Sequence, residues 1–370
     1  MLAGALVGGV IGYAGFGLLG ADLGEEIKPA LREQFGGWTA LVVVALAVLA
    51  GFAAIAVHEL GHVLGGAAAR FRFWLYVVGP LRVERDEATG RITVGLNREA
   101  SLYGGVAASL PTDTRDLPRR LALMVAGGPL ASVALALLAW LPLGLGAPLS
   151  ALARLALGLL TALSAGLAGV TLLPMRSGGF TSDGGRLLRL ARGGPVARRE
   201  AATLPLLGLF AAETPPREWP RELIDAATEL RDGSMEECYA AVFAYYHALD
   251  SGDAARAGWW IDRVVELSGA YPPALAPSLF VEAAYFEGAC RRDAARARRL
   301  LARVPEKSFV VKPFDRARAE AALALAEGDR ERAREHARRA LAAIPAGSAF
   351  RRERLHEILR ATEAPAAAAV

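Results

Sequence analysis

The chain has little of several residues on which common protein classes depend. Cysteine occurs twice in 370 residues, at Cys238 and Cys290, without a CxxC pair or other ligand-like spacing. This excludes a disulfide framework and predicts two reduced thiols. Lysine occurs only at Lys28, Lys307 and Lys312, so arginine carries almost all of the positive charge. The formal net charge is only +4 and the arginines are interleaved with acids, which indicates solvated helix surfaces and no nucleic-acid partner.

Hydrophobic residues, in contrast, are abundant. They make up 54% of the chain, yet 22% of the residues are charged. The two kinds occupy different regions, because nearly all long apolar runs lie in residues 1–175 and the charged residues dominate from about residue 185 onward. This distribution predicts a membrane half followed by a water-soluble half.

Four segments are long enough to cross a bilayer, which takes roughly 20 apolar residues. These segments are Met1–Ala21, Trp38–Ala69, Leu121–Leu145 and Ser150–Leu173. The first has neither a basic start nor a cleavage-site pattern, so a retained span is expected rather than a removed signal peptide. Its glycines Gly4, Gly8 and Gly12 have the spacing of a close helix contact, although a glycine-loosened interfacial helix is an alternative.

The distribution of basic residues predicts the orientation of these spans. The first connection holds Lys28 and Arg32, whereas the connection between the second and third spans holds nine arginines. By the positive-inside rule, the N-terminus, the long connection and the C-terminus are cytoplasmic. The expected location is the cell membrane of a bacterium, as a multi-pass protein.

Within the long connection, Phe73–Glu84 and Arg91–Asn97 are rich in β-branched and aromatic residues and flank the turn-like segment Asp86–Gly90. They predict a β-hairpin beside the membrane. The expected fold is therefore an all-α polytopic membrane protein with about four transmembrane helices, a cytoplasmic β-hairpin insertion and a C-terminal α-helical repeat domain.

The repeat domain is expected from three helical pairs in the charged half. Asp253, Asp293 and Asp329 stand at equivalent turns, 40 and 36 residues apart. This period resembles a stack of tetratricopeptide-like repeats. The expected organisation is a membrane domain at 1–192, a linker at 193–232 around Thr214-Pro215-Pro216, a cytoplasmic repeat domain at 233–362 and a disordered tail at 363–370.

Two motifs carry the expected chemistry. His58-Glu59-Leu60-Gly61-His62 places two imidazoles on one helical face, able to reach one zinc ion, with a carboxylate beside them as general base. The alternative is that these residues only occupy the headgroup zone. Asp183, in Asp183-Gly184-Gly185 after the fourth span, offers a third ligand, or alternatively the N-cap of a helix over 184–192. The second and fourth spans run in the same direction, so both motifs lie at cytoplasmic ends.

These residues resemble the site-2 protease family of intramembrane zinc metalloproteases. The resemblance covers about residues 38–192 and implies that His58, His62 and Asp183 bind Zn²⁺ and that Glu59 is the general base. Gly127-Gly128-Pro129 resembles a further small-residue and proline feature of the family. Two departures are Thr171, where many relatives have asparagine, and a longer stretch between Pro174 and Asp183.

The implied activity is hydrolysis of peptide bonds within or near transmembrane segments by zinc-activated water. A substrate helix must unwind first, and an edge of the hairpin could hold it by strand addition, unless the hairpin is only a structural cap. The expected partners are a transmembrane protein substrate, the lipid bilayer and a cytoplasmic protein bound by the repeats. Trp259, Trp260, Tyr239, Tyr245 and Tyr246 could line that recognition groove, or form core between repeats. Two other functions remain open at this stage: a membrane-anchored helical-repeat scaffold with a vestigial metal site, and a zinc-handling transporter.

Overall fold

The structure is a computed structural model, and it describes residues 27–86, 89–98, 102–177, 180–308, 310–344 and 348–363. The chain divides into two compact units, Met1–Ala201 and Ala202–Val370. The expected first span, Met1–Ala21, lies outside the described residues, as does the expected tail beyond Glu363.

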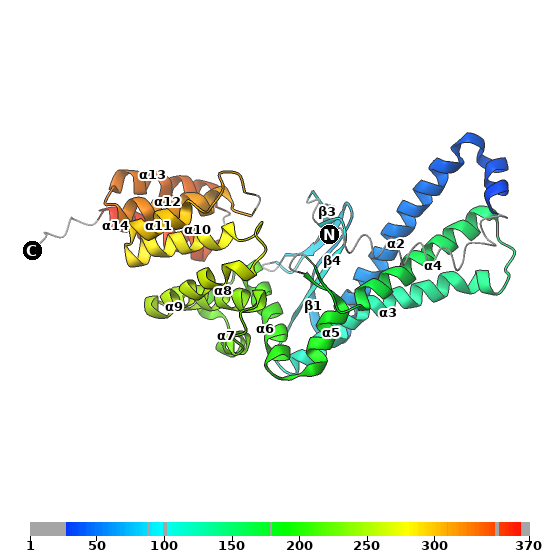
Figure 1. Ribbon diagram of the computed structural model, residues 1–370, viewed down its shortest axis with the longest axis horizontal. Coiled ribbons are helices and arrows are strands. Elements are labelled where there is room, and N and C mark those ends of the chain that lie inside the picture. The colour runs from blue at the N-terminus through cyan, green and yellow to red at the C-terminus, as the bar shows by residue number, and fades with distance from the viewer. Residues whose placement is uncertain are drawn as a thin grey trace, which may run out of the picture. The chain divides into compact units, whose positions relative to one another are not determined.

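Three helices of the N-terminal unit are long and apolar enough to cross a membrane. They are Ile27–Ala68, which the 3₁₀ turn η1 (Gly36–Trp38) interrupts before α2 (Thr39–Ala68), α3 (Leu117–Gly144) and α4 (Ala151–Leu172). The expected helices at 38–69, 121–145 and 150–173 are thus confirmed as helices to within four residues at each end. Figure 1 shows these helices lying side by side, with α5 (Asp183–Arg192) following α4.

Glycine brings α2 and α3 into backbone contact. A Cβ atom on Gly61 would overlap the carbonyl oxygen of Gly127, and one on Gly127 would overlap the carbonyl oxygen of Gly61. One turn further along α2, a Cβ on Gly65 would lie 2.7 Å from the carbonyl oxygen of Leu123. Helices this close need small residues at the contact, which is the packing typical of membrane helices.

The expected hairpin is part of a larger antiparallel sheet. Its order is β3-β2-β1-β4, from β1 (Phe71–Val78), β2 (Leu81–Arg85), β3 (Ile92–Leu96) and β4 (Val106–Pro111). The β2–β3 hairpin has the expected turn, but a single strand over Phe73–Glu84 is wrong. Gly79, with a φ of 53°, and Pro80 form a turn that splits this segment into β1 and β2.

The sheet lies along α2. The hydroxyl of Tyr76 on β1 donates to the carbonyl of Ala56, at 2.9 Å, and Gly79 lies against the ring of Phe52. Phe52 stands 16 residues before the end of α2, which corresponds to about 24 Å along the helix axis. The β1–β2 turn therefore contacts the middle of α2 and not its end.

From α6 onward the chain is helical. The helices are α6 (Gly194–Ala211), α7 (Arg221–Thr228), α8 (Met235–Asp250), α9 (Ala254–Glu266), α10 (Pro277–Phe286), α11 (Ala294–Leu301), α12 (Pro313–Ala326), α13 (Arg330–Ala343) and α14 (Ala349–Glu363), joined in part by the short turns η3 (Pro216–Glu218), η4 (Leu267–Ala270) and η5 (Glu287–Arg291). The segment 193–232, expected as a linker, thus contains two helices, and the division between the units falls within α6.

Three helices of the C-terminal unit begin in the same way. Asp253, Asp293 and Asp329 are the N-caps of α9, α11 and α13, and each side chain accepts a hydrogen bond from the backbone N–H three residues later. In each case the capped helix contacts the helix before it, as Figure 1 shows for α8 with α9 and for α12 with α13. The aspartates that set the expected period therefore begin the second helix of each pair.

Most of the aromatic residues considered for a recognition groove are core. Tyr245, Tyr246 and Trp260 are buried, whereas Trp259 is 46% exposed and has the guanidinium of Arg231 over its ring at 4.7 Å. Tyr239, the fifth, is half-buried. Helical spacing therefore explains the buried three, and only Trp259 among the five is exposed.

Candidate metal centre

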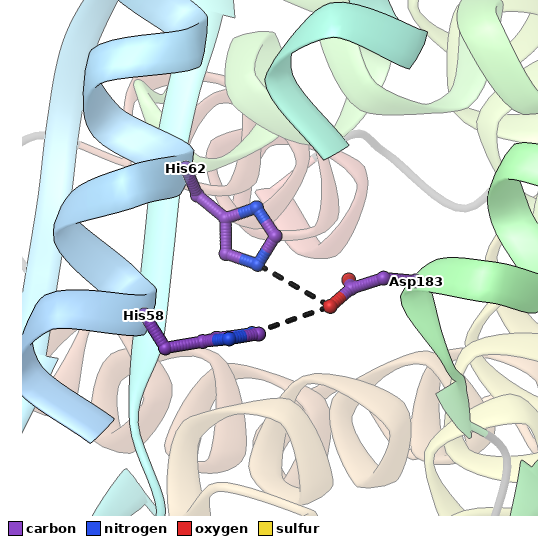
Figure 2. A group of neighbouring side chains, drawn as sticks. All are labelled: His58, His62 and Asp183. Atoms are coloured by element: carbon purple, nitrogen blue, oxygen red, sulfur yellow. Dashed lines mark ion pairs between the residues drawn. The ribbon is translucent and has the colours of Figure 1, made fainter. Parts of the chain in front are cut away.

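The two histidines of α2 and the aspartate that begins α5 form one cluster. Oδ2 of Asp183 lies 3.2 Å from Nε2 of His58 and 3.6 Å from Nε2 of His62. Figure 2 shows both imidazoles directed at this carboxylate. The two ring planes are almost perpendicular, with an angle of 87° between them. One ligand atom from each residue lies within 4.8 Å of the other two, so the cluster could hold a metal ion.

Residues of α3 contact the Nδ1 atoms of both imidazoles, on the side of each ring away from Asp183. Nδ1 of His62 donates to the carbonyl of Met124, at 3.0 Å, because a carbonyl oxygen can only accept. A proton on Nδ1 leaves the Nε2 lone pair of a neutral imidazole free on the side of Asp183. Nδ1 of His58 lies 2.8 Å from Oγ of Ser132, which is fully buried. These partners fix the ring orientation, as outer partners of metal-binding histidines do.

Gly128 leaves the space that the two imidazoles occupy. A Cβ atom at this position would overlap Nε2 and Cε1 of His62 and would lie 2.9 Å from Nε2 of His58. Gly128 belongs to the Gly127-Gly128-Pro129 step, so this step brings α3 against the donor atoms. Only glycine lets the backbone of α3 approach the cluster this closely.

Asp183 is free to face the histidines because its neighbour caps the helix. The hydroxyl of Ser182 accepts from the N–H of Gly185, at 3.2 Å, so Ser182 and not Asp183 is the N-cap of α5. A Cβ on Gly184 would overlap the carbonyl oxygen of Leu172, the last residue of α4. The glycine after Asp183 therefore lets α5 begin directly against the end of α4.

The longer stretch before Asp183 forms a small β-ribbon. Strands β5 (Arg176–Ser177) and β6 (Phe180–Thr181) pair in antiparallel fashion, and the N–H of Ser182 donates to the carbonyl of Met175, at 3.0 Å. The two strands thus turn the chain back on itself. Asp183 returns to the end of α4 despite the added length.

The carboxyl group of Asp183 is the acidic member of the cluster, and its side chain is only 16% exposed. A carboxylate at this position suits a metal cation, because metal binding requires the deprotonated ligand.

Glu59 adjoins the cluster without belonging to it. Its carboxyl accepts a hydrogen bond from the backbone of Ala107, on β4. A Cβ on Gly105 would lie 2.8 Å from Oε1 of Glu59, so the glycine that leads into β4 makes room for this side chain. The sheet, whose strand β4 was not expected from the sequence, therefore orients the predicted base.

The structure thus brings together all four residues expected at the site. The donor set of two imidazoles and one carboxylate suits Zn²⁺ and also other divalent ions such as Fe²⁺. The supporting residues Ser132, Met124 and Ala107 were not expected, since single polar or apolar residues in α3 and β4 carry no local signal for a contact with α2. Comparison of the chain with protein-family models, with curated proteins and with solved structures finds no match.

Proposed function

We propose that the protein is a zinc-dependent intramembrane endopeptidase that cleaves transmembrane segments of other membrane proteins. One observation carries the proposal: His58, His62 and Asp183 converge inside a bundle of apolar helices, with the carboxyl of Glu59 beside them. His58 lies ten residues before the end of α2, or about 15 Å along its axis. That depth favours a metal site within the bilayer over residues that merely occupy the headgroup zone.

The residues of this chain have distinct roles in the proposed reaction. A bound zinc ion supplies Lewis acidity toward a carbonyl and lowers the pKa of water toward about 7. His58, His62 and Asp183 hold the ion, and Ser132 and Met124 keep the imidazoles oriented. Glu59 accepts a proton from the attacking water and returns it to the leaving amine, as a general base does.

The sheet supplies a place for the unwound substrate. β4 pairs only with β1 among the described strands, so its other edge has no strand partner, and Ala107 on β4 contacts Glu59. A substrate strand added to this edge would have its peptide bonds close to the base, and backbone hydrogen bonds would hold it extended. This favours a substrate-holding role for the sheet over that of a plain cap.

The sheet also has an apolar face suited to lipid. Ile92, Val94 and Leu96 alternate along β3 and are 57%, 71% and 73% exposed. Since the β1–β2 turn contacts Phe52 in the middle of α2, we place the sheet beside the helices within the membrane boundary.

The C-terminal unit, whose helix pairs resemble tetratricopeptide repeats, is then a cytoplasmic domain that binds a protein partner.

The decisive experiment measures metal content and cleavage separately. His58→Ala, His62→Ala and Asp183→Ala each remove a donor, so zinc per purified chain and proteolysis of a model transmembrane substrate should fall together. Glu59→Gln keeps the donors but cannot accept the proton. Its zinc content should stay near that of the wild type while turnover falls by about 10²–10⁴-fold.

Glu33→Gln, a matched substitution at an exposed glutamate in the residue 27–35 helix, should change neither quantity. If Glu59→Gln cleaved as well as the wild type, the protease proposal would fail and the scaffold function would replace it. If the purified chain held iron and no zinc, the choice of metal would be wrong.

A further inference from the structure

A pocket of about 480 Å³ lies where α2 ends and α3 begins. Its charged lining consists of Arg70, Arg115, Arg119, Arg120, Asp113 and Asp116. Four guanidinium groups against two carboxylates leave the pocket with a net positive charge. It is separate from the metal cluster, since none of its lining residues belongs to that cluster.

Arg120 builds the wall of this pocket. Its guanidinium donates to the carbonyls of Ala69 and Arg70, at 2.8 and 3.2 Å, and to the carboxylate of Asp113, at 2.7 Å. It thereby ties the end of α2 to the loop before α3. Arg70 and Asp116 both have positive φ, 58° and 47°, a conformation that persists only where the surroundings enforce it.

The other arginines at the pocket contribute little to its packing. Arg70 and Arg119 are exposed, and neither guanidinium has a hydrogen-bond or ion-pair partner within the described part of the chain. Arg115 is 85% exposed, and its Nε lies 3.6 Å from Asp113. Guanidinium groups bind phosphate oxygens by paired hydrogen bonds, so an exposed group of them at a pocket suits a phosphate.

An apolar stripe continues from the pocket along α3. Leu123 lines the pocket, and Leu130 and Leu137 follow at intervals of seven residues, which places all three on one face of the helix. They are 46%, 63% and 60% exposed. A ligand that matches both features has an anionic head and a hydrocarbon tail.

We propose that this pocket binds the phosphate headgroup of an anionic glycerophospholipid, whose acyl chain lies along Leu123, Leu130 and Leu137. The inference rests on the proposed membrane insertion of α2 and α3, but not on zinc or proteolysis. Basic pockets between transmembrane helices at the cytoplasmic side are suited to such headgroups.

The test is native mass spectrometry of the full chain in detergent, titrated with dioleoyl phosphatidylglycerol or with dioleoyl phosphatidylcholine. We expect the wild type to retain phosphatidylglycerol in preference to phosphatidylcholine. The double variant Arg70→Gln/Arg119→Gln should bind phosphatidylglycerol about 25-fold more weakly, at roughly fivefold for each arginine. Asp116→Asn should bind it more tightly, because the substitution removes a negative charge from the pocket.

Arg91→Gln/Arg98→Gln is the matched control, since it removes the same charge from exposed positions on either side of β3. An equal loss in both double variants, or equal retention of the two lipids, would overturn the proposal. Displacement of the lipid by millimolar inorganic phosphate would also overturn it, in favour of a soluble phosphate ligand. His58→Ala should retain phosphatidylglycerol like the wild type, which separates this outcome from failure of the protease proposal.

Discussion

The helices of the N-terminal unit meet mainly through glycine, whereas those of the C-terminal unit meet mainly through alanine, aromatic rings and buried ion pairs, with one close glycine contact at Gly288. Gly61 and Gly127 bring α2 and α3 into backbone contact, while many large apolar side chains of these helices, such as Leu64 and Leu130, remain exposed. Within the described residues, the only exposed large apolar side chains of the C-terminal unit are Leu207 and Trp259.

The difference follows from the two surroundings that we propose. In water, helices associate by burying apolar side chains, as Tyr245 and Phe286 are buried in the C-terminal unit. In lipid the hydrocarbon is as apolar as leucine, so helices gain most from close backbone contact and from satisfied polar groups. One chain thus contains both kinds of packing, and each can be tested with substitutions that should leave the other unit intact.

The largest effect is expected in the core of the C-terminal unit. Glu282 is buried and is bound by the hydroxyls of Tyr245 and Tyr246, at 2.9 and 3.1 Å, and by the guanidinium of Arg318. Burial raises the pKa of both tyrosines, so their hydroxyls stay protonated and donate. Arg318→Ala should destabilise this unit by about 3–5 kcal/mol, because the carboxylate loses its only cationic hydrogen-bond partner in the described structure.

Hydrogen exchange of the α8, α10 and α12 amides in the full chain measures this loss, and the amides of α2 and α3 should not change. Arg298 pairs with Glu327 at the surface and is 64% exposed, so Arg298→Ala should cost less than about 1 kcal/mol. If the two substitutions lowered the free energy of unfolding equally, the buried ion pair would stabilise the unit no more than the exposed one does.

A smaller effect is expected where glycine meets the metal cluster. The Cβ of Gly128→Ala would overlap the imidazole of His62, so the ring must turn and lose its alignment with Asp183. Metal affinity should fall by about 10–100-fold, the range typical of a disturbed ligand orientation. Competition with a chelator measures the change. Gly158→Ala is the control, because a Cβ on Gly158 has no neighbour within 4 Å, and unchanged affinity in both variants would contradict the close approach.

The smallest effects are expected at the three aspartate caps. Asp253→Ala, Asp293→Ala and Asp329→Ala each remove one hydrogen bond to an unpaired N–H group and should cost about 1 kcal/mol. Exchange at the first turns of α9, α11 and α13 reports the loss, and the corresponding asparagine variants should restore most of it. Similar values at all three positions would support equivalent helix pairs, whereas one dominant cap would argue against a repeat.

Local patterns predicted what is local in this molecule. The long apolar runs yielded α2, α3 and α4, and the aspartate period yielded the starts of three helices. The prolines at 215 and 216 suggested a linker, but they lie at a short 3₁₀ turn between helices α6 and α7. The turn signal of Gly79-Pro80 lies inside an otherwise β-rich segment, so the sequence predicted one strand where the structure has β1 and β2.

At the metal site, too, the sequence predicted the local motifs but not the contacts between distant segments. The histidine spacing and the aspartate were visible in the sequence, but their supports were not. Ser132 reaches His58 across 74 residues, and Ala107 reaches Glu59 from a strand that forms only by pairing with β1. Contacts of this kind depend on packing between segments, and no periodicity within a segment records them.

The β5–β6 ribbon lets Asp183 lie close to the end of α4 although residues 173–182 separate them in the sequence. The bond between Ser182 and Met175 closes the ribbon at its base, so the length of chain beyond this bond does not set the position of Asp183. The entropy of closing a loop rises by only about 0.6 kcal/mol for each doubling of its length. The interval between Pro174 and Asp183 is therefore free to vary in length, while Gly184 against Leu172 fixes the point at which the carboxylate returns.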